Sequence, residues 1–82
     1  MENKRIAVAA IVIDDPEAAA DVNAVLHEYG DMIIGRMGVP YKERGVSLIS
    51  VALDAEPDVI SGLTGRLGKI KGVSAKAAIS KK

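Results

Sequence analysis

Residues 35–45 hold the side chains best suited to binding another molecule. This polar segment contains Arg36, Tyr41 and three glycines and lies between two apolar runs. An arginine side chain forms paired hydrogen bonds with a carboxylate, and glycines expose backbone amides that help to hold an anion. We therefore predict that Gly35, Arg36, Gly38 and Tyr41 contact a small ligand or a partner protein.

The same segment also fits a simple connector between two strands. Gly35, Gly38 and Gly45 would then supply positive φ angles, and Pro40 would stiffen the turn. Eleven residues is long for a hairpin loop, and long loops carry function more often than short ones. Both interpretations stay open from the sequence.

Nucleic-acid binding through a loop from Gly35 to Gly38 is the alternative function. The segment from Ile33 to Gly38 is similar to the Ile-Gly-x-x-Gly loop with which KH domains hold a nucleic-acid backbone. In KH domains that loop joins two helices, whereas here an extended run precedes it. The 11 basic and 11 acidic residues cancel, and two tyrosines are the only aromatic residues, so neither charge nor base stacking favours this function.

The remaining polar residues predict neither catalysis nor a metal site. His27 is the single histidine, and the chain has no cysteine. A metal held by His27 would need Glu28, Asp31 or a second subunit, while a histidine at a helix end is well explained by its interaction with unpaired carbonyls. Acidic residues cluster at the starts of two expected helices, where capping explains them. We predict a non-enzymatic protein without a cofactor.

The first half of the chain reads as a strand, a helix and a second strand. Residues 6–13 are apolar at odd and even positions alike, which is typical of a strand buried on both faces. Asp15 and Pro16 start a helix that we expect to end at Gly30 with a left-handed cap. Residues 31–37 then form a short strand, and Gly35 within it indicates a sheet edge or a bulge.

The second half repeats this order. Residues 46–53 alternate as a third strand, with Ile49, Val51 and Leu53 on one face. Residues 54–57 open a second helix that ends near Gly68, and residues 73–80 form a half-exposed fourth strand. Glycines at every third position of this helix, Gly62, Gly65 and Gly68, predict close packing against a neighbour.

These elements predict an α+β fold of the ferredoxin-like type. The order βαββαβ gives a four-stranded antiparallel sheet, with strand order 4-1-3-2 and two helices on one face. We expect a single domain over residues 1–82. Because the first and third strands are apolar on both faces and the helices cover only one, we also expect a homo-oligomer, a dimer or a tetramer. It would bury the uncovered face or pair sheet edges, with the second or fourth strand as the candidate edge.

The composition favours a cytoplasmic location. A small domain without cysteine suits a reducing compartment. The apolar run 6–13 ends at two aspartates without a cleavage site for a signal peptide, and it is too short to cross a bilayer.

Several segments together resemble the family of small iron-only hydrogenase system regulators. The segments are Val22-Asn23, Leu26-His27-Glu28-Tyr29, Ile34-Gly35-Arg36-Met37-Gly38-Val39-Pro40-Tyr41, Ile60-Ser61-Gly62-Leu63 and Gly65-Arg66-Leu67-Gly68. The resemblance runs from about residue 5 to residue 76. It implies the same βαββαβ fold, similar to ACT domains and to the C-terminal domain of the nickel-responsive repressor, which form oligomers.

The resemblance implies regulation through a ligand or a hydrogenase-related protein. The nickel site of the repressor is made of several histidines and a cysteine, so it does not transfer to a chain with His27 alone. Once four strands and two helices are assigned, no segment is left for a DNA-reading module.

Overall fold

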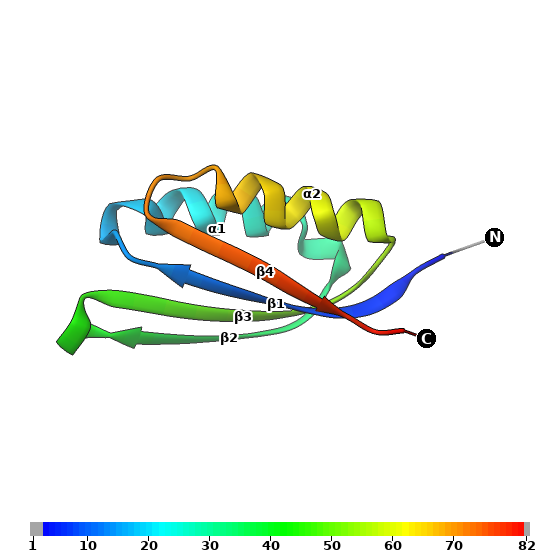
Figure 1. The fold of residues 1–82 in the computed structure, drawn as a ribbon, viewed down its shortest axis with the longest axis horizontal. Helices are drawn as coiled ribbons and strands as arrows, with labels where there is room; N and C mark the ends of the chain where they lie inside the picture. The colour runs from blue at the N-terminus through cyan, green and yellow to red at the C-terminus, as the bar shows by residue number, and fades with distance from the viewer. Residues whose placement is uncertain (1–2, 82) are drawn as a thin grey trace.

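The computed structural model describes residues 3–81. Its strands are β1 (Arg5–Ile13), β2 (Ile33–Tyr41), β3 (Val46–Ala55) and β4 (Val73–Ile79), and its helices are α1 (Ala19–Glu28) and α2 (Pro57–Gly68). The strands form one antiparallel sheet in the order β2-β3-β1-β4, which is the predicted 4-1-3-2 order read from the other edge. Both helices lie on the same side of the sheet (Figure 1). The expected fold class is confirmed.

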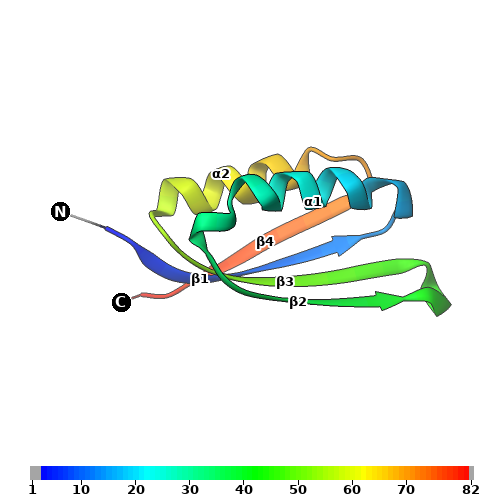
Figure 2. The same ribbon diagram turned by 180° about the vertical axis from the view of Figure 1, so that it is seen from behind.

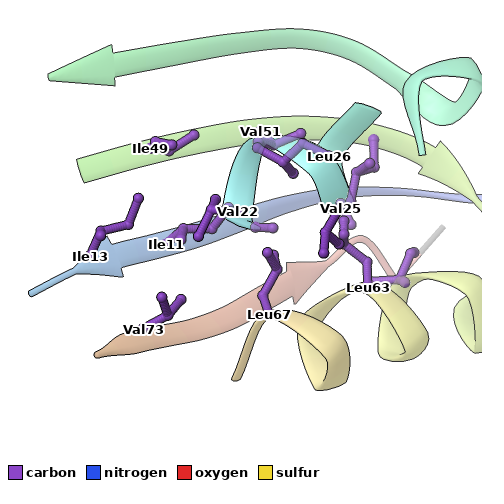
Figure 3. Packing of buried hydrophobic residues seen from close by; sticks show 14 of the residues in the cluster. Ile11, Ile13, Val22, Val25, Leu26, Ile49, Val51, Leu63, Leu67 and Val73 are labelled. Atoms are coloured by element: carbon purple, nitrogen blue, oxygen red, sulfur yellow. The ribbon is translucent and has the colours of Figure 1, made fainter. Parts of the chain in front are cut away.

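The hydrophobic core lies between this sheet and the two helices. Successive side chains of a strand point to opposite faces, so β1 sends every second residue, from Ala7 to Ile13, into the core. Val22 and Leu26 of α1 and Leu63 and Leu67 of α2 lie against the strands (Figure 3). Spacings of three and four residues place these side chains on one stripe of each helix.

The junction between β1 and α1 is fixed by two hydrogen bonds. The Asp15 carboxylate accepts from the Glu17 amide at 3.0 Å, as predicted for a helix cap, and a short 3-10 turn (Pro16–Ala18) leads into α1. The Asp14 amide donates to the Gly72 carbonyl at 2.7 Å, which ties this junction to the start of β4. The two halves of the chain are therefore joined at this end of the sheet.

The second strand is longer than the sequence predicts. It runs to Tyr41, so only a 3-10 turn (Lys42–Arg44) and Gly45 connect it to β3. Gly45 has the predicted positive φ of 67°, but the expectation of positive φ at Gly35 and Gly38 was wrong because both lie in extended β2. The predicted edge and bulge are both confirmed: β2 is an outer strand, and its register with β3 shifts between Ile33 and Gly35.

Helix α1 does not end on a left-handed glycine. Gly30 starts a second 3-10 turn (Gly30–Met32), and the positive-φ glycines among the described residues are Gly45 and Gly72. The expected cap at Gly30 was therefore wrong. The Tyr29 amide reaches back to the Leu26 carbonyl instead, so a tightened last turn satisfies the helix end without positive φ.

The three glycines of α2 differ in their surroundings. A Cβ atom at Gly62 would lie 3.4 Å from the Tyr29 hydroxyl, whereas one at Gly65 or Gly68 would meet no atom within 4 Å. Within residues 3–81, the predicted close packing is confirmed at Gly62, whereas a Cβ at Gly65 or Gly68 has no such neighbour; packing of these two glycines against a partner subunit stays a prediction. Neither α1 nor α2 has the length and apolar character needed to cross a membrane.

Gly65→Ala is expected to stabilise the folded chain. The position is helical and exposed, and alanine favours an α-helix over glycine by roughly 1 kcal/mol. Urea unfolding should show a rise of about 0.5–1 kcal/mol in the free energy of unfolding. Gly62→Ala is the matched control, with a smaller gain because of Tyr29. Destabilisation by Gly65→Ala would show that this surface of α2 packs against another molecule.

Candidate functional site

Arg36 is held across the gap between β2 and α1. In the sheet register it lies opposite the buried residue Val51, which places it on the helix-facing side of β2. One of its terminal nitrogens, Nη2, donates to the Asn23 Oδ1 atom of α1 at 2.8 Å. No carboxylate among residues 3–81 forms an ion pair with Arg36. The guanidinium is thus oriented by a neutral partner, through a hydrogen bond between two exposed side chains.

A hollow of about 240 Å³ lies beside this pair. Its floor comes from β1 and β3, one wall from the first turns of α1 and the other from β2. It is lined by Ile13, Ala19, Asn23, Arg36, Gly38, Val39, Pro40, Ser47, Leu48 and Ile49. Figure 2 shows α1 above this part of the sheet, with β2 and β3 running below it toward their connecting turn. The hollow is mostly apolar, and Arg36 is the one charged residue that lines it in the described part of the chain.

The structure brings together two of the four residues predicted to form a contact site. Arg36 and Gly38 both line the hollow, since alternate residues of a strand share a face. Tyr41 belongs to the opposite set, lies across from Val46, and its hydroxyl is 3.4 Å from Glu43 Oε2. Gly35 lies at the bulge and lines no part of this hollow.

Asn23 was not among the predicted site residues. It is exposed on α1 and lies thirteen positions before Arg36 in the chain, so no local spacing connects the two. Two features of the sequence pointed to it: an asparagine in the middle of a helix has low helix propensity, and Asn23 belongs to a segment that carries the family resemblance. The pairing depends on where the fold places α1 relative to β2.

The KH-like interpretation of Gly35 to Gly38 does not fit the structure. These residues lie inside β2 and pair with β3, and the segments on either side are 3-10 turns. A clamp of the KH type needs a loop between two helices. The expectation of such a loop was therefore wrong.

The sheet face turned away from the helices is a second candidate site. Paired residues on neighbouring strands share a face, and the register places Val8 beside Ala52, Val12 beside Leu48, and Leu48 beside Val39. We define the open face as this side of the sheet. Its large apolar members are Ile6, Val8, Val12, Met37, Val39, Tyr41, Val46 and Leu48. Most of these side chains are more than 40% exposed.

The open face carries little charge. The register assigns it Asp54, opposite Ile6, and Lys76, opposite Ala10. A shallow apolar hollow along β1, β2 and β3 runs between Val12, Met37 and Leu48. Large exposed apolar patches are typical of interaction surfaces, which makes the open face a candidate site.

A surface network around Arg66 links the two helices. Arg66 donates to both Glu28 carboxylate oxygens, at 3.1 and 2.9 Å, and its guanidinium lies 5.6 Å from the Tyr29 ring centre. These hydrogen bonds lower the pKa of Glu28, so the contribution of the pair is present at neutral pH and is lost on acidification. Both side chains are about half exposed, which keeps this contribution small.

His27 lies in the last turn of α1 and is exposed. Within the described part of the chain, no three histidine, cysteine or acidic side chains gather closely enough to hold a metal ion. The acidic residues at the helix starts act as predicted at Asp15, whose side chain caps the turn before α1. Arg36 and the open face are therefore the features to which a function can be assigned.

Comparison with known proteins identifies a family. Residues 5–77 match the model of the TM1266-like family, whose description is "Iron-only hydrogenase system regulator, putative". Protein TM1266 from Thermotoga maritima has a solved structure that superposes with a TM-score of 0.92 at 35% sequence identity, covering 96% of this chain and 100% of that one. No curated protein sequence matches the chain.

Two more distant structures share the fold alone. The C-terminal domain of MgtC from Mycobacterium tuberculosis matches with a TM-score of 0.74 at 15% identity, covering 99% of this chain and 93% of that domain. A formyltetrahydrofolate deformylase from Pseudomonas putida matches with a TM-score of 0.63 at 16% identity, covering 89% of this chain and 28% of the enzyme. The βαββαβ unit thus occurs both as a separate domain and as part of a larger enzyme.

Proposed function

Because the chain belongs to the TM1266-like family of iron-only hydrogenase system regulators, we propose that it is a non-enzymatic, ACT-like regulatory module. In this proposal several copies assemble, and the assembly acts through a small ligand or a hydrogenase-related protein. The observation that carries the proposal is the open face. The cysteine-free composition supports action in the reducing cytoplasm.

The open face supports assembly because its apolar composition is typical of a sheet face that another layer covers. A sheet with one wet face alternates apolar and polar residues, yet β1 is apolar on both sides. Val8 and Val12 lie in this strand at the centre of the sheet, flanked by β3 and β4. Covering the open face would give the molecule the second apolar layer that its two helices do not supply.

A second copy of this chain is the occupant that we propose. The open face is nearly free of charge, so two such faces meet without repulsion and bury the same residues on both sides. Edge pairing is less well supported: β2 contains Pro40, which has no amide hydrogen to donate, and β4 carries Lys76.

Arg36 supports the ligand part of the proposal. It is charged, held in place by Asn23 and open to a hollow, which are properties of an anion-binding side chain. Tyr41, on the other side of β2, contributes to the open face. A ligand at Arg36 and an assembly contact at Tyr41 would thus lie on the same strand.

Val8→Lys is expected to separate the copies. Val8 is 46% exposed in the single chain, so lysine is tolerated there, but assembly would bury its charge. Light scattering at tens of micromolar, a rough working concentration for micromolar affinity, should give a multiple of the chain mass for the wild type and a single chain for the variant. Circular dichroism should show an unchanged fold.

Ile79→Lys is the matched control. Ile79 is 40% exposed and lies opposite Ala7, on the helix-facing side of the sheet. This variant should keep the mass of the wild type. A wild type that is monomeric at these concentrations, or equal masses for Val8→Lys and the wild type, would refute assembly through the open face.

A further inference from the structure

We propose that the hollow beside Arg36 binds a small aliphatic monocarboxylate that carries no cationic group. This inference rests on the ligand part of the proposed function and gives that ligand a chemical class. Three properties of the hollow support this inference. Arg36 has hydrogen-bond donors that Asn23 does not use, the lining is mostly apolar, and the charge on the lining is positive.

Arg36 supplies the site for a carboxylate. A guanidinium has five N–H donors in a planar fork, and Asn23 accepts one of them. The remaining donors are enough for the paired hydrogen bonds that arginine makes with a carboxylate. The bond to Asn23 fixes the orientation of the guanidinium, which reduces the conformational entropy lost on binding.

The rest of the hollow suits a short aliphatic tail. Ile13 and Ile49 belong to the hydrophobic core and form an apolar floor, and Pro40 and Ala19 lie on the walls. The volume of about 240 Å³ is below the 300–1,000 Å³ typical of sites for drug-sized molecules. The hollow therefore suits a ligand of a few carbon atoms.

The charge of the lining distinguishes a plain carboxylate from an amino acid. Among residues 3–81, no aspartate or glutamate lines the hollow, so the ammonium group of an amino acid would lose water without gaining an anionic partner there. Arg36 offers one positive charge, which balances a monocarboxylate but leaves a phosphate dianion only partly neutralised. Aliphatic monoanions without an ammonium group are thus favoured.

Isovalerate is a suitable probe. We expect it to shift the backbone amide signals of Gly38 and Ser47 in nitrogen-15 NMR spectra of the full chain, with saturation in the millimolar range or below, on the order expected for so small a ligand. Valine, which adds an ammonium group to the same carbon skeleton, and isopentanol, which lacks the charge, should each bind at least about tenfold more weakly.

Two variants test the role of the guanidinium. Arg36→Gln removes the charge and should weaken isovalerate binding at least about tenfold, whereas Arg44→Gln, in the turn between β2 and β3 and outside the hollow, should leave it unchanged. Asn23→Asp places a carboxylate within hydrogen-bond reach of Arg36. It should compete with isovalerate and weaken binding as strongly as Arg36→Gln, while the unfolding midpoint in urea stays the same.

Four results would overturn the inference. The first is an absence of amide shifts with isovalerate up to about 20 mM, a concentration at which an affinity in the millimolar range would still be detected. The second and third are binding of isovalerate by Arg36→Gln, or by Asn23→Asp, that equals binding by the wild type. The fourth is binding of valine as tight as that of isovalerate. The assembly state, measured by light scattering on the same samples, is a separate readout. Loss of isovalerate binding in a protein that still assembles would therefore refute the ligand class alone.

Discussion

Gly72→Ala is expected to lower the free energy of unfolding by about 3 kcal/mol, combining backbone strain with a steric clash. Gly72 has a φ of 82°, a conformation that strains any residue with a side chain. A Cβ atom there would also lie 2.6 Å from the Cβ of Asp15 and 3.3 Å from its backbone nitrogen. These atoms belong to or adjoin the main chain, so the clash is not relieved by a side-chain rotation.

The effect should be large because Gly72 lies at the junction of the two halves of the fold. Its carbonyl accepts from the Asp14 amide, and Asp15 caps the turn before α1. Moving either residue to make room would disturb both the cap and the start of β4.

Urea unfolding of Gly72→Ala, with Gly30→Ala as the control, tests this expectation. Gly30 also lies in a tight turn, but its φ is not positive and a Cβ there would meet no atom within 4 Å. The control should change stability by less than about 1 kcal/mol. A loss below about 1 kcal/mol for Gly72→Ala would contradict the close approach of Gly72 and Asp15.

Leu63→Ala is the second substitution with a large expected effect. Leu63 is fully buried between α2 and the sheet, and truncating a buried leucine costs about 2–5 kcal/mol through lost burial and the cavity left behind. The expected loss of stability is about 3 kcal/mol, independent of protein concentration.

Leu48→Ala makes the same chemical change on the open face. Leu48 is 42% exposed in the single chain, so its truncation should matter little at low concentration. If copies assemble through the open face, the loss should grow with protein concentration because assembly stabilises the folded state by mass action. Urea unfolding at two concentrations checks both substitutions. Equal losses for Leu63→Ala and Leu48→Ala at low concentration would contradict the assigned core.

Much of the fold could be predicted because local patterns and global packing agree in β1, α1, β3 and α2. The apolar stripe through Val22 and Leu26 has the helical period, and Ile49, Val51 and Leu53 have the strand period. The absence of a polar alternation in β1 correctly indicated a strand at the centre of the sheet.

Strand β2 was harder to predict because its local residues argue against a strand. Gly35, Gly38 and Pro40 all have low strand propensity, so the segment from Gly35 reads as a loop. Pairing with β3 overrides this preference, and the edge position accommodates Pro40. At Gly30 the sequence predicted a left-handed cap that the structure does not have. A glycine after a helix often marks such a cap but does not require one.

The candidate site, too, could be predicted only in part from the sequence. Arg36 was predictable from its chemistry, because an arginine among glycines suits an anion. Its partner Asn23 and the hollow beside them depend on the placement of α1 relative to β2, which no local spacing in the sequence encodes. Tyr41 lies on the open face, away from Arg36, because residues 35–41 form a strand rather than a loop, and side chains alternate between the two faces of a strand.

The central claim is that copies of this chain meet through the open face, and methyl NMR with a gadolinium chelate in solution tests it most directly. In a single chain Val8, Leu48 and Ile79 are 46%, 42% and 40% exposed, so the chelate should attenuate their methyl signals almost equally. Our account predicts that at tens of micromolar, a rough working concentration for micromolar affinity, the Val8 and Leu48 signals are protected while that of Ile79 is attenuated. Equal attenuation of all three would contradict it.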